Sequence, residues 1–411
     1  MISYHTCPLA SEEGKETGGM NVYVLELSRQ LTSMGHHVDI FTRSVDPNNK
    51  PVVDVSPGLR VIHLAAGPQK MVSKKELTPY IPDFIQSYQE FCRKDDVTYD
   101  IIHCHYYLSG LIGNEIRKHT VPPTPFIMSF HTLALMKNLV ARSEEEKENV
   151  HRIEAERLLL TCANRIIASS ESEGSYLEYL YDTPKEKITI IPPGVDTELF
   201  RPIESNVAKD HIHVPRAQKL ILFAGRIEPL KGIDVLLYAM KIVLARNPKY
   251  PVCLCIVGGD ISQPPTEWSR THRSLDDLRK LLGLTASVTF VGQKPQHELP
   301  YYYNAADMVV MPSHYESFGM AALEAMACGV PVITTNVTGI SSLVDEKHAS
   351  LITTVNNPLL LASQIEYFLR QPQKREEVGA SLRKHVMDLS WSHIAKKITA
   401  VYDLSMKGNI V

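Results

Sequence analysis

The chain has 411 residues, of which 44% are hydrophobic and 22% charged, and its formal net charge is −3. This composition is typical of globular proteins, and the length favours two domains of about 200 residues each. Lys and Arg are scattered along a nearly neutral chain, which argues against a nucleic-acid partner, and no apolar run approaches the roughly 20 residues that span a bilayer.

Short β-branched runs alternate with longer amphipathic stretches, which predicts an α/β fold of parallel sheets with helices on both faces. In the first half we predict strands, with helices between most of them, at 1–4, 37–42, 60–64, 101–103, 126–130, 165–168 and 188–191. Residues 77–91 contain large apolar side chains that favour a helix packed on the core: Tyr80, Ile81, Phe84, Ile85, Tyr88 and Phe91. The alternative for that helix is contact with a membrane surface and a lipid acceptor.

Two prolines and a glycine at 192–194 interrupt regular structure, so we place a domain junction there. The alternation then restarts, with predicted strands at 220–224, 252–257, 288–291 and 308–311 and helices from about 233 and near 275–282. The expected domains are residues 1–194 and 195–388. Residues 389–411 are expected to form a closing helix on the first domain, because apolar residues recur there at helical spacing. Two Rossmann-like halves would leave a cleft between them.

The segment 312–333 is read as strand end, loop, short helix and strand. Gly319 allows a close backbone approach, 320–327 are good helix formers, and the free amides of a first helical turn attract phosphate. Glu316 and Glu324 lie eight residues apart, roughly 12 Å if helical, so they could hold opposite ends of an elongated ligand. The alternative makes Glu316 a helix cap and Glu324 a solvated residue.

Residues 222–232 form a predicted strand that ends in Gly225 and a loop that carries Arg226 and Lys231. Two cations at a strand end can neutralise a leaving diphosphate, as a metal does elsewhere, and no Asp-x-Asp pair is present to hold a metal. The alternative is that both are surface cations.

These motifs resemble the donor half of retaining glycosyltransferases of family 4, which have the GT-B fold. The resemblance rests on Gly225-Arg226, Lys231-Gly232, the motif from Glu316 to Glu324, and Ala327-Cys-Gly-x-Pro331. It implies that Arg226 and Lys231 bind the diphosphate, that Glu316 contacts the donor sugar, and that Glu324 contacts the ribose. The implied donor site also includes Gly225, Ser317, Phe318, Gly319 and Met320. Val337-Thr338-Gly339-Ile340 departs from the family, whose members often have two glycines there.

In the first half, Gly18 and Gly19 precede a helix and can bring bare backbone near a phosphate, although a simple turn is the alternative. The fingerprint Gly-x-Gly-x-x-Gly is absent, which argues against a nicotinamide enzyme. His131 lies just past a predicted strand, where it is either functional or structural. His103 and His105 lack a second cluster to complete a zinc site, so we expect no metal and expect His105 and Tyr106 to line the cleft.

A narrower resemblance is carried by 17–24, 105–110 and 131–138. These segments are similar to the inositol-phosphate N-acetylglucosaminyltransferases of mycothiol synthesis and to sucrose-phosphate synthases. The resemblance implies that Gly18 and Gly19 lie at the diphosphate and His131 near the donor sugar. The implied ligands of a phosphorylated acceptor are Asn21, Lys74, Tyr106, Thr132 and Arg152.

The expected function is therefore transfer of a hexose or N-acetylhexosamine, with retention, from a nucleoside-diphosphate sugar, UDP-sugar favoured, to a small polar acceptor such as an inositol phosphate or sugar phosphate. No carboxylate is evident as a nucleophile, which favours front-face attack by the acceptor hydroxyl, with His131, Arg226, Lys231 and Glu316 as catalytic residues. No metal cofactor is expected. The alternatives are a sucrose-phosphate-synthase-like enzyme, a lipid or polysaccharide glycosyltransferase, a GT-B phosphorylase or epimerase, and a sugar-nucleotide sensor.

We also expect a cytoplasmic location, because the first residues lack a secretory signal and the seven cysteines are irregularly spaced. A homodimer and peripheral membrane contact are both compatible with the sequence.

Overall fold

A computed structural model describes residues 1–11, 18–337, 339 and 351–407. Contacts within the chain divide it into two compact units. The first joins Met1–Ala10, Gly19–Gly194 and the segment that begins at Trp391. The second joins Val195–Ser390 and also takes in Gly18. Among the described residues, no helix has the length and apolar character needed to cross a bilayer.

The first unit contains two sheets whose strands are nearly all parallel, as the alternation predicts. One sheet has the order β1-β3-β2 and the other the order β4-β5-β6-β7. Strand β2 is antiparallel to β3 and was not predicted. The strands are β1 (Val38–Arg43), β2 (Val52–Ser56), β3 (Leu59–Leu64), β4 (Ile102–His105), β5 (Phe126–Ser129), β6 (Arg165–Ala168) and β7 (Ile188–Ile190).

The predicted strand at residues 1–4 is wrong as a regular element. Only Ile2 pairs there, with single bridges to Phe41 of β1 and Cys104 of β4. The ladder stops because the Tyr4 amide donates to the Ser109 hydroxyl at 3.0 Å and not to a strand carbonyl. A run of four residues can therefore link two strands without extending either sheet.

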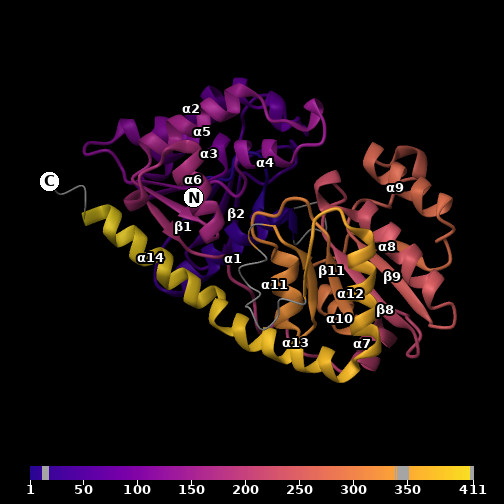
Figure 1. The fold of residues 1–411 in the computed structure, drawn as a ribbon. Coiled ribbons are helices and arrows are strands. Elements are labelled where there is room, and N and C mark those ends of the chain that lie inside the picture. Colours follow the sequence, from indigo (N-terminus) through magenta and orange to yellow (C-terminus); the bar gives the residue numbers. More distant parts are fainter. Residues whose placement is uncertain (12–17, 338, 340–350, 408–411) are drawn as a thin grey trace. The chain divides into compact units, whose positions relative to one another are not determined.

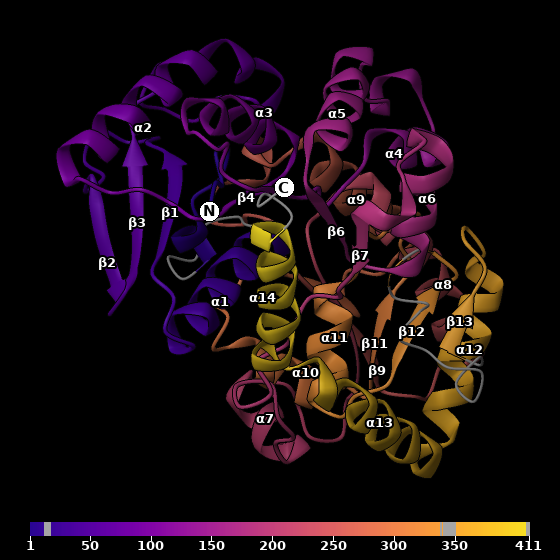
Figure 2. The same ribbon diagram turned by 90° about the vertical axis from the view of Figure 1, so that its left-hand side faces the viewer.

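Seven helices surround these strands among the described residues of the first unit. Helix α2 packs its apolar face on the core, with Phe84 against Tyr4 and Tyr88 against Phe41, as the packed-helix interpretation predicts. Helix α14 lies beside α1 (Figure 2). Between them, the rings of Trp391 and Tyr23 meet edge to face with their centroids 5.4 Å apart. The helices are α1 (Gly19–Ser33), α2 (Ile81–Asp95), α3 (Tyr107–Ile116), α4 (Ala134–Val140), α5 (Val150–Cys162), α6 (Glu171–Tyr181) and α14 (Trp391–Lys407).

The second unit is built on one parallel sheet with the order β10-β9-β8-β11-β12-β13. Figure 1 labels β8, β9 and β11 of this sheet. Its central strands are buried on both faces, which accounts for their continuous apolar sequences. The strands are β8 (Lys219–Ala224), β9 (Val252–Val257), β10 (Val288–Gly292), β11 (Met308–Met311), β12 (Val332–Thr335) and β13 (Ile352–Thr353). The predicted strands of this half are all present, and β13 is an addition.

Two groups of helices cover this sheet. Helix α8 contacts α9 and α12, while α10 contacts α7 and α11, and α11 contacts α13. This is the two-sided cover expected for a parallel α/β sheet. The helices are α7 (Ser205–His211), α8 (Ile233–Arg246), α9 (Arg270–Leu281), α10 (Leu299–Ala305), α11 (Met320–Ala327), α12 (Pro358–Arg370) and α13 (Pro372–Val386).

Candidate active site

An ion pair joins the loops that follow β8 and β11, which are neighbours in the sheet of the second unit. Lys231 Nζ donates to Glu316 Oε2 at 2.5 Å, and the two side chains are only 14% and 9% exposed. The structure therefore brings together two residues that are 85 positions apart in the chain. The surface-cation alternative is wrong for Lys231, and the helix-cap alternative is wrong for Glu316.

Gly232 explains how these two loops come so close. Its φ is +64°, and a Cβ built there would lie 2.1 Å from the Pro312 carbonyl oxygen. Any side chain would collide with that backbone, so glycine is required for the approach. The residue after Lys231 thus fixes the distance between the end of β8 and the end of β11.

Arg226 follows Gly225 at the end of β8 and is the more accessible cation. Its NH1 pairs with Glu228 at 2.7 Å, and the two side chains are 37% and 38% exposed. Exposed ion pairs of this kind contribute little, so Arg226 can exchange Glu228 for another anion at small cost. A Cβ on Gly18 would lie 3.8 Å from Arg226 Nε, so the first glycine of the Gly-Gly pair lies beside this cation. Gly19 is the first residue of α1.

Helix α11 begins and ends where the sequence predicts. Gly319, rather than Glu316, is its N-cap, with φ +93°, and Met320 is its first residue. Phe318 is buried, and a Cβ on Gly339 would lie 2.5 Å from the Ser317 carbonyl oxygen. Thr338 and Ile340, which belong to the segment that differs from the family's two-glycine sequence, lie outside the described residues.

Glu324 is buried in the second turn of α11, so the solvated alternative is wrong. Its side chain accepts a hydrogen bond from the Tyr303 hydroxyl at 2.7 Å, and the residue is 6% exposed. Burial raises the pKa of Glu324 to about 7, because the charged form loses its hydration. The Tyr303 hydrogen bond opposes this rise.

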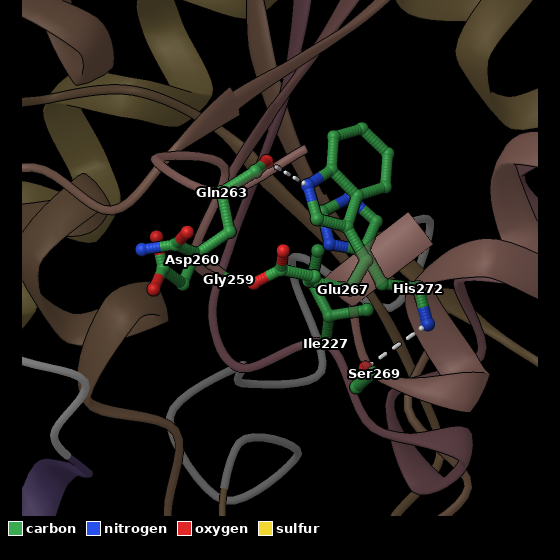
Figure 3. Close-up of a pocket in the computed structure, with 8 residues that line it drawn as sticks. Ile227, Gly259, Asp260, Gln263, Glu267, Ser269 and His272 are labelled. Atoms are coloured by element: carbon green, nitrogen blue, oxygen red, sulfur yellow. Dashed lines mark hydrogen bonds between the residues drawn. The ribbon is translucent and has the colours of Figure 1, made fainter. Parts of the chain in front are cut away.

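A cavity of about 180 Å³ is lined by residues of the second unit that include Ile227, Gly259 and His272 (Figure 3). Ile227, which follows Arg226, and Gly259, which follows β9, form part of its wall. Trp268 stacks on His272 with ring centroids 4.0 Å apart, and His272 Nε2 is buried without a hydrogen-bond partner among the described residues. No motif in the sequence indicated this cavity.

In the first unit, two non-glycine residues at the carboxyl ends of β4 and β5 have left-handed backbones. Tyr106 has φ +77° and His131 has φ +61°. Such conformations cost about 1–3 kcal/mol each and persist where the surroundings enforce them, often at functional sites. Both residues belong to the predicted substrate-binding set.

His131 rests on a second histidine. Its Nε2 is 3.0 Å from His105 Nδ1, and His105 is completely buried, so the expectation that His105 lines a cleft is wrong. His103 Nε2 lies 2.9 Å from the Ser129 hydroxyl oxygen and its Nδ1 lies 2.8 Å from the Tyr402 hydroxyl oxygen of α14. Burial lowers the pKa of His131 to about 3, so the imidazole is neutral near pH 7. The described residues contain no group of three His, Cys, Asp or Glu side chains that could hold a metal ion.

Arg152 lies at the centre of the predicted acceptor residues and is 3% exposed. Its NH2 donates to the Thr132 carbonyl at 2.8 Å and to the Thr132 hydroxyl at 3.1 Å. Its Cζ lies 4.9 Å from the Tyr106 ring centroid, and Lys74 Nζ lies 5.9 Å from the same centroid. The structure therefore groups four of the five predicted residues. The fifth, Asn21, donates to the Thr6 hydroxyl and the Cys7 carbonyl, so both its amide hydrogens are already used.

Known proteins match the chain over nearly its whole length. Residues 17–199 match the model of Glycosyltransferase Family 4, and residues 207–385 match that of Glycosyl transferases group 1. The D-inositol 3-phosphate glycosyltransferase of Corynebacterium efficiens is 34% identical over 98% of this chain and 94% of its own. The chain belongs to the group 1 and family 4 glycosyltransferases.

Two further relatives agree with that assignment. The D-inositol 3-phosphate glycosyltransferase of Corynebacterium jeikeium is 35% identical over 98% of this chain and 96% of its own. The solved sucrose-phosphate synthase of Thermosynechococcus elongatus matches with a TM-score of 0.89 and 31% identity, covering 99% of this chain and 98% of that one. The predicted GT-B fold and the predicted enzyme class are confirmed.

Some residues of this glycosyltransferase's candidate site were missed by the sequence analysis. Tyr303 holds Glu324, and both Glu148 and Glu156 hold Arg152 at 2.9 Å and 2.8 Å. Tyr303 lies on a different helix from Glu324, and the two glutamates lie four residues before and after Arg152. None of the three belongs to a sequence motif. The i,i+4 spacing of both glutamates with Arg152 was the available signal.

Proposed function

We propose that this glycosyltransferase moves a hexosyl or N-acetylhexosaminyl group, with retention of configuration, from a UDP-sugar to a small phosphorylated acceptor. The observation that carries the proposal is the buried Lys231–Glu316 pair beside the N-terminus of α11. The names of the relatives, an inositol 3-phosphate glycosyltransferase and a sucrose-phosphate synthase, support an acceptor that carries a phosphate.

On the donor side, Arg226 and Lys231 would neutralise the diphosphate together with the backbone around the first turn of α11. Glu316 already orients the Lys231 ammonium and would accept hydrogen bonds from the donor sugar. Glu324 would accept from the ribose. The remaining donor contacts are assigned to Gly18, Gly19, Gly225, Ser317, Phe318, Gly319 and Met320.

For the chemical step we propose front-face displacement. The acceptor hydroxyl oxygen bonds to the anomeric carbon as the bond from that carbon to the diphosphate oxygen breaks, and the departing phosphate takes the hydroxyl proton. Arg226 and Lys231 stabilise the negative charge that develops on the leaving group, so the step requires no metal ion. A neutral His131 contributes a hydrogen bond to the donor sugar and no charge.

On the acceptor side, Lys74, Tyr106, Thr132 and Arg152 would surround the phosphorylated substrate, and Asn21 would hold the neighbouring loop. A sucrose-phosphate-synthase-like reaction, with a sugar phosphate as acceptor, is the second candidate, favoured by the 31% identity to that enzyme. A cytoplasmic location and a dimer stay predictions.

The test is a transfer assay on the purified full chain. UDP- and GDP-sugars are each combined with an inositol phosphate, a hexose phosphate, and the corresponding unphosphorylated compounds. We expect a product only with a phosphorylated acceptor, and proton NMR should show the anomeric configuration of the donor in that product. Transfer to unphosphorylated acceptors alone, or an inverted product, would contradict the proposal.

A further inference from the structure

One carboxylate in the first unit lies between two cations that come from different helices. Lys137 of α4 donates from Nζ to Glu148 Oε1, and Arg152 of α5 pairs with the same oxygen at 2.9 Å. A single oxygen that takes bonds from an ammonium and a guanidinium occupies the position that an oxygen of a bound anion would take. The place is thus an anion site, filled by part of the chain itself.

The cationic side of this site is rigid. Arg152 is 3% exposed, and its Cζ lies 4.9 Å and 5.2 Å from the ring centroids of Tyr106 and Tyr107. Its Nε donates to Glu156 at 2.8 Å. Glu156 is completely buried and also accepts from the Ala134 amide at 2.9 Å and from the Tyr181 hydroxyl. Glu156 therefore holds the guanidinium in place.

Glu148 is also held through its backbone, independently of its carboxylate. Its amide donates to Asn138 Oδ1 at 2.7 Å, and its carbonyl accepts from Asn138 Nδ2 at 3.3 Å. It lies just before α5, and its side chain is 17% exposed. The carboxylate can turn toward solvent while these backbone bonds stay in place.

The balance of charge in this site indicates which class of ligand could replace the Glu148 carboxylate. Lys137 and Arg152 supply two positive charges, and Glu148 and Glu156 cancel both. With Glu148 turned away, one positive charge remains, together with the Lys137 ammonium and the NH1 of Arg152 as donors. A phosphate, with more charge and more acceptor oxygens than a carboxylate, is the ligand class that this arrangement favours.

We propose that Glu148 is an internal competitor for the anionic group of the acceptor: its carboxylate occupies the phosphate position between Lys137 and Arg152 and is displaced when the acceptor binds. This inference rests on the proposed function, since it concerns the phosphate of the acceptor. Glu148 thereby makes the enzyme select phosphorylated over unphosphorylated acceptors. A neutral polyol cannot replace the carboxylate on the two cations, whereas a phosphorylated one can.

The test uses Glu148→Gln in the full chain, with inorganic phosphate as the probe. Binding is titrated by calorimetry and by thermal shift at constant ionic strength, with chloride as the balancing anion. Removing the competing charge should tighten phosphate binding about tenfold, because a hydrogen-bonded charge pair of this kind contributes on that scale. The matched control is Glu154→Gln, six residues farther along the chain in α5, whose side chain is 67% exposed and lies near His151. It should leave phosphate binding within twofold of the wild type.

Two further variants keep the outcome decisive. Lys137→Met in the Glu148→Gln background should abolish the gain, and Glu148→Ala should reproduce it if the glutamine variant unfolds. Unchanged or weaker phosphate binding in the Glu148 variants would overturn the proposal, as would a gain that survives Lys137→Met. If the transfer assay finds no phosphorylated acceptor, the proposed function fails, but the phosphate titration still decides the role of Glu148.

Discussion

Glu324 offers a quantitative test, because the structure places an acid in a buried site with one neutral donor. Burial raises the pKa of Glu324 from 4.5 to about 7, with the Tyr303 hydroxyl as its hydrogen-bond partner. At 1.36 kcal/mol for each pKa unit, this rise corresponds to about 3 kcal/mol. The folded state therefore takes up a proton that the unfolded state has released between pH 4.5 and pH 7.

The sign of the effect follows from linkage. The contribution of Glu324 to stability is fully present below pH 4.5 and is lost as the pH rises through 7, because the unfolded state binds fewer protons there. Glu324→Gln removes the ionisation and keeps an oxygen for Tyr303. The free energy of unfolding of the variant minus that of wild type should therefore be larger, that is more stabilising, by about 2.5 kcal/mol at pH 8 than at pH 5, because part of the total is already lost at pH 5.

Urea denaturation followed by circular dichroism at pH 5 and pH 8 measures this difference. Glu377→Gln is the control, because that side chain is 69% exposed and should show no comparable pH dependence. A difference between Glu324→Gln and wild type that stays constant from pH 5 to pH 8 would refute the reasoning. It would mean that the pKa of Glu324 in the folded state is close to the usual value of 4.5.

The other predictions concern the loop after β8 and the histidine that follows β5. Lys231→Ala should lower turnover by about 10²–10³-fold, because it removes charge from the leaving diphosphate, while circular dichroism stays unchanged. Lys280→Ala, whose side chain is 56% exposed, should leave turnover near wild type, and equal losses in both variants would argue against the role of Lys231. Gly232→Ala should destabilise the chain by about 2 kcal/mol or more in chemical denaturation, because its Cβ would lie 2.1 Å from the Pro312 carbonyl oxygen. Nitrogen NMR should find the His131 ring neutral from pH 8 down to pH 5, since its pKa is about 3, and a titration near pH 6.5 would contradict the burial assigned to it.

The second unit was the more predictable half, because its elements carry local signals. Continuous apolar runs predicted β8 and β9, and the helix formers at 320–327 between two glycines gave the bounds of α11. Arg226 and Lys231 follow a strand directly, so parallel topology alone places them at one edge of the sheet. The family motif assigns Glu316 and Lys231 to the same donor site, but it predicts no contact between them, and the structure shows one at 2.5 Å.

What the sequence did not reveal depends on contacts between distant segments. Strand β2 is half exposed at a sheet edge, so its sequence pattern is weak. The segment 1–4 resembles a strand, but only Ile2 pairs, with one isolated bridge to each of two strands. The local sequence is compatible with a solvent-exposed Glu324, and its burial depends on Tyr303, which comes from another helix and donates a hydrogen bond to it. The fit of Glu148 between Lys137 and Arg152 likewise depends on how α4 and α5 pack, which no motif records.

The most direct test of the account is a crystal structure of the full chain with UDP. The account predicts that the diphosphate lies at the carboxyl ends of β8 and β11, within hydrogen-bond distance of the Lys231 ammonium and the Arg226 guanidinium and against the first turn of α11. A structure in which the nucleotide is bound elsewhere, with Lys231 still paired only to Glu316, would contradict it.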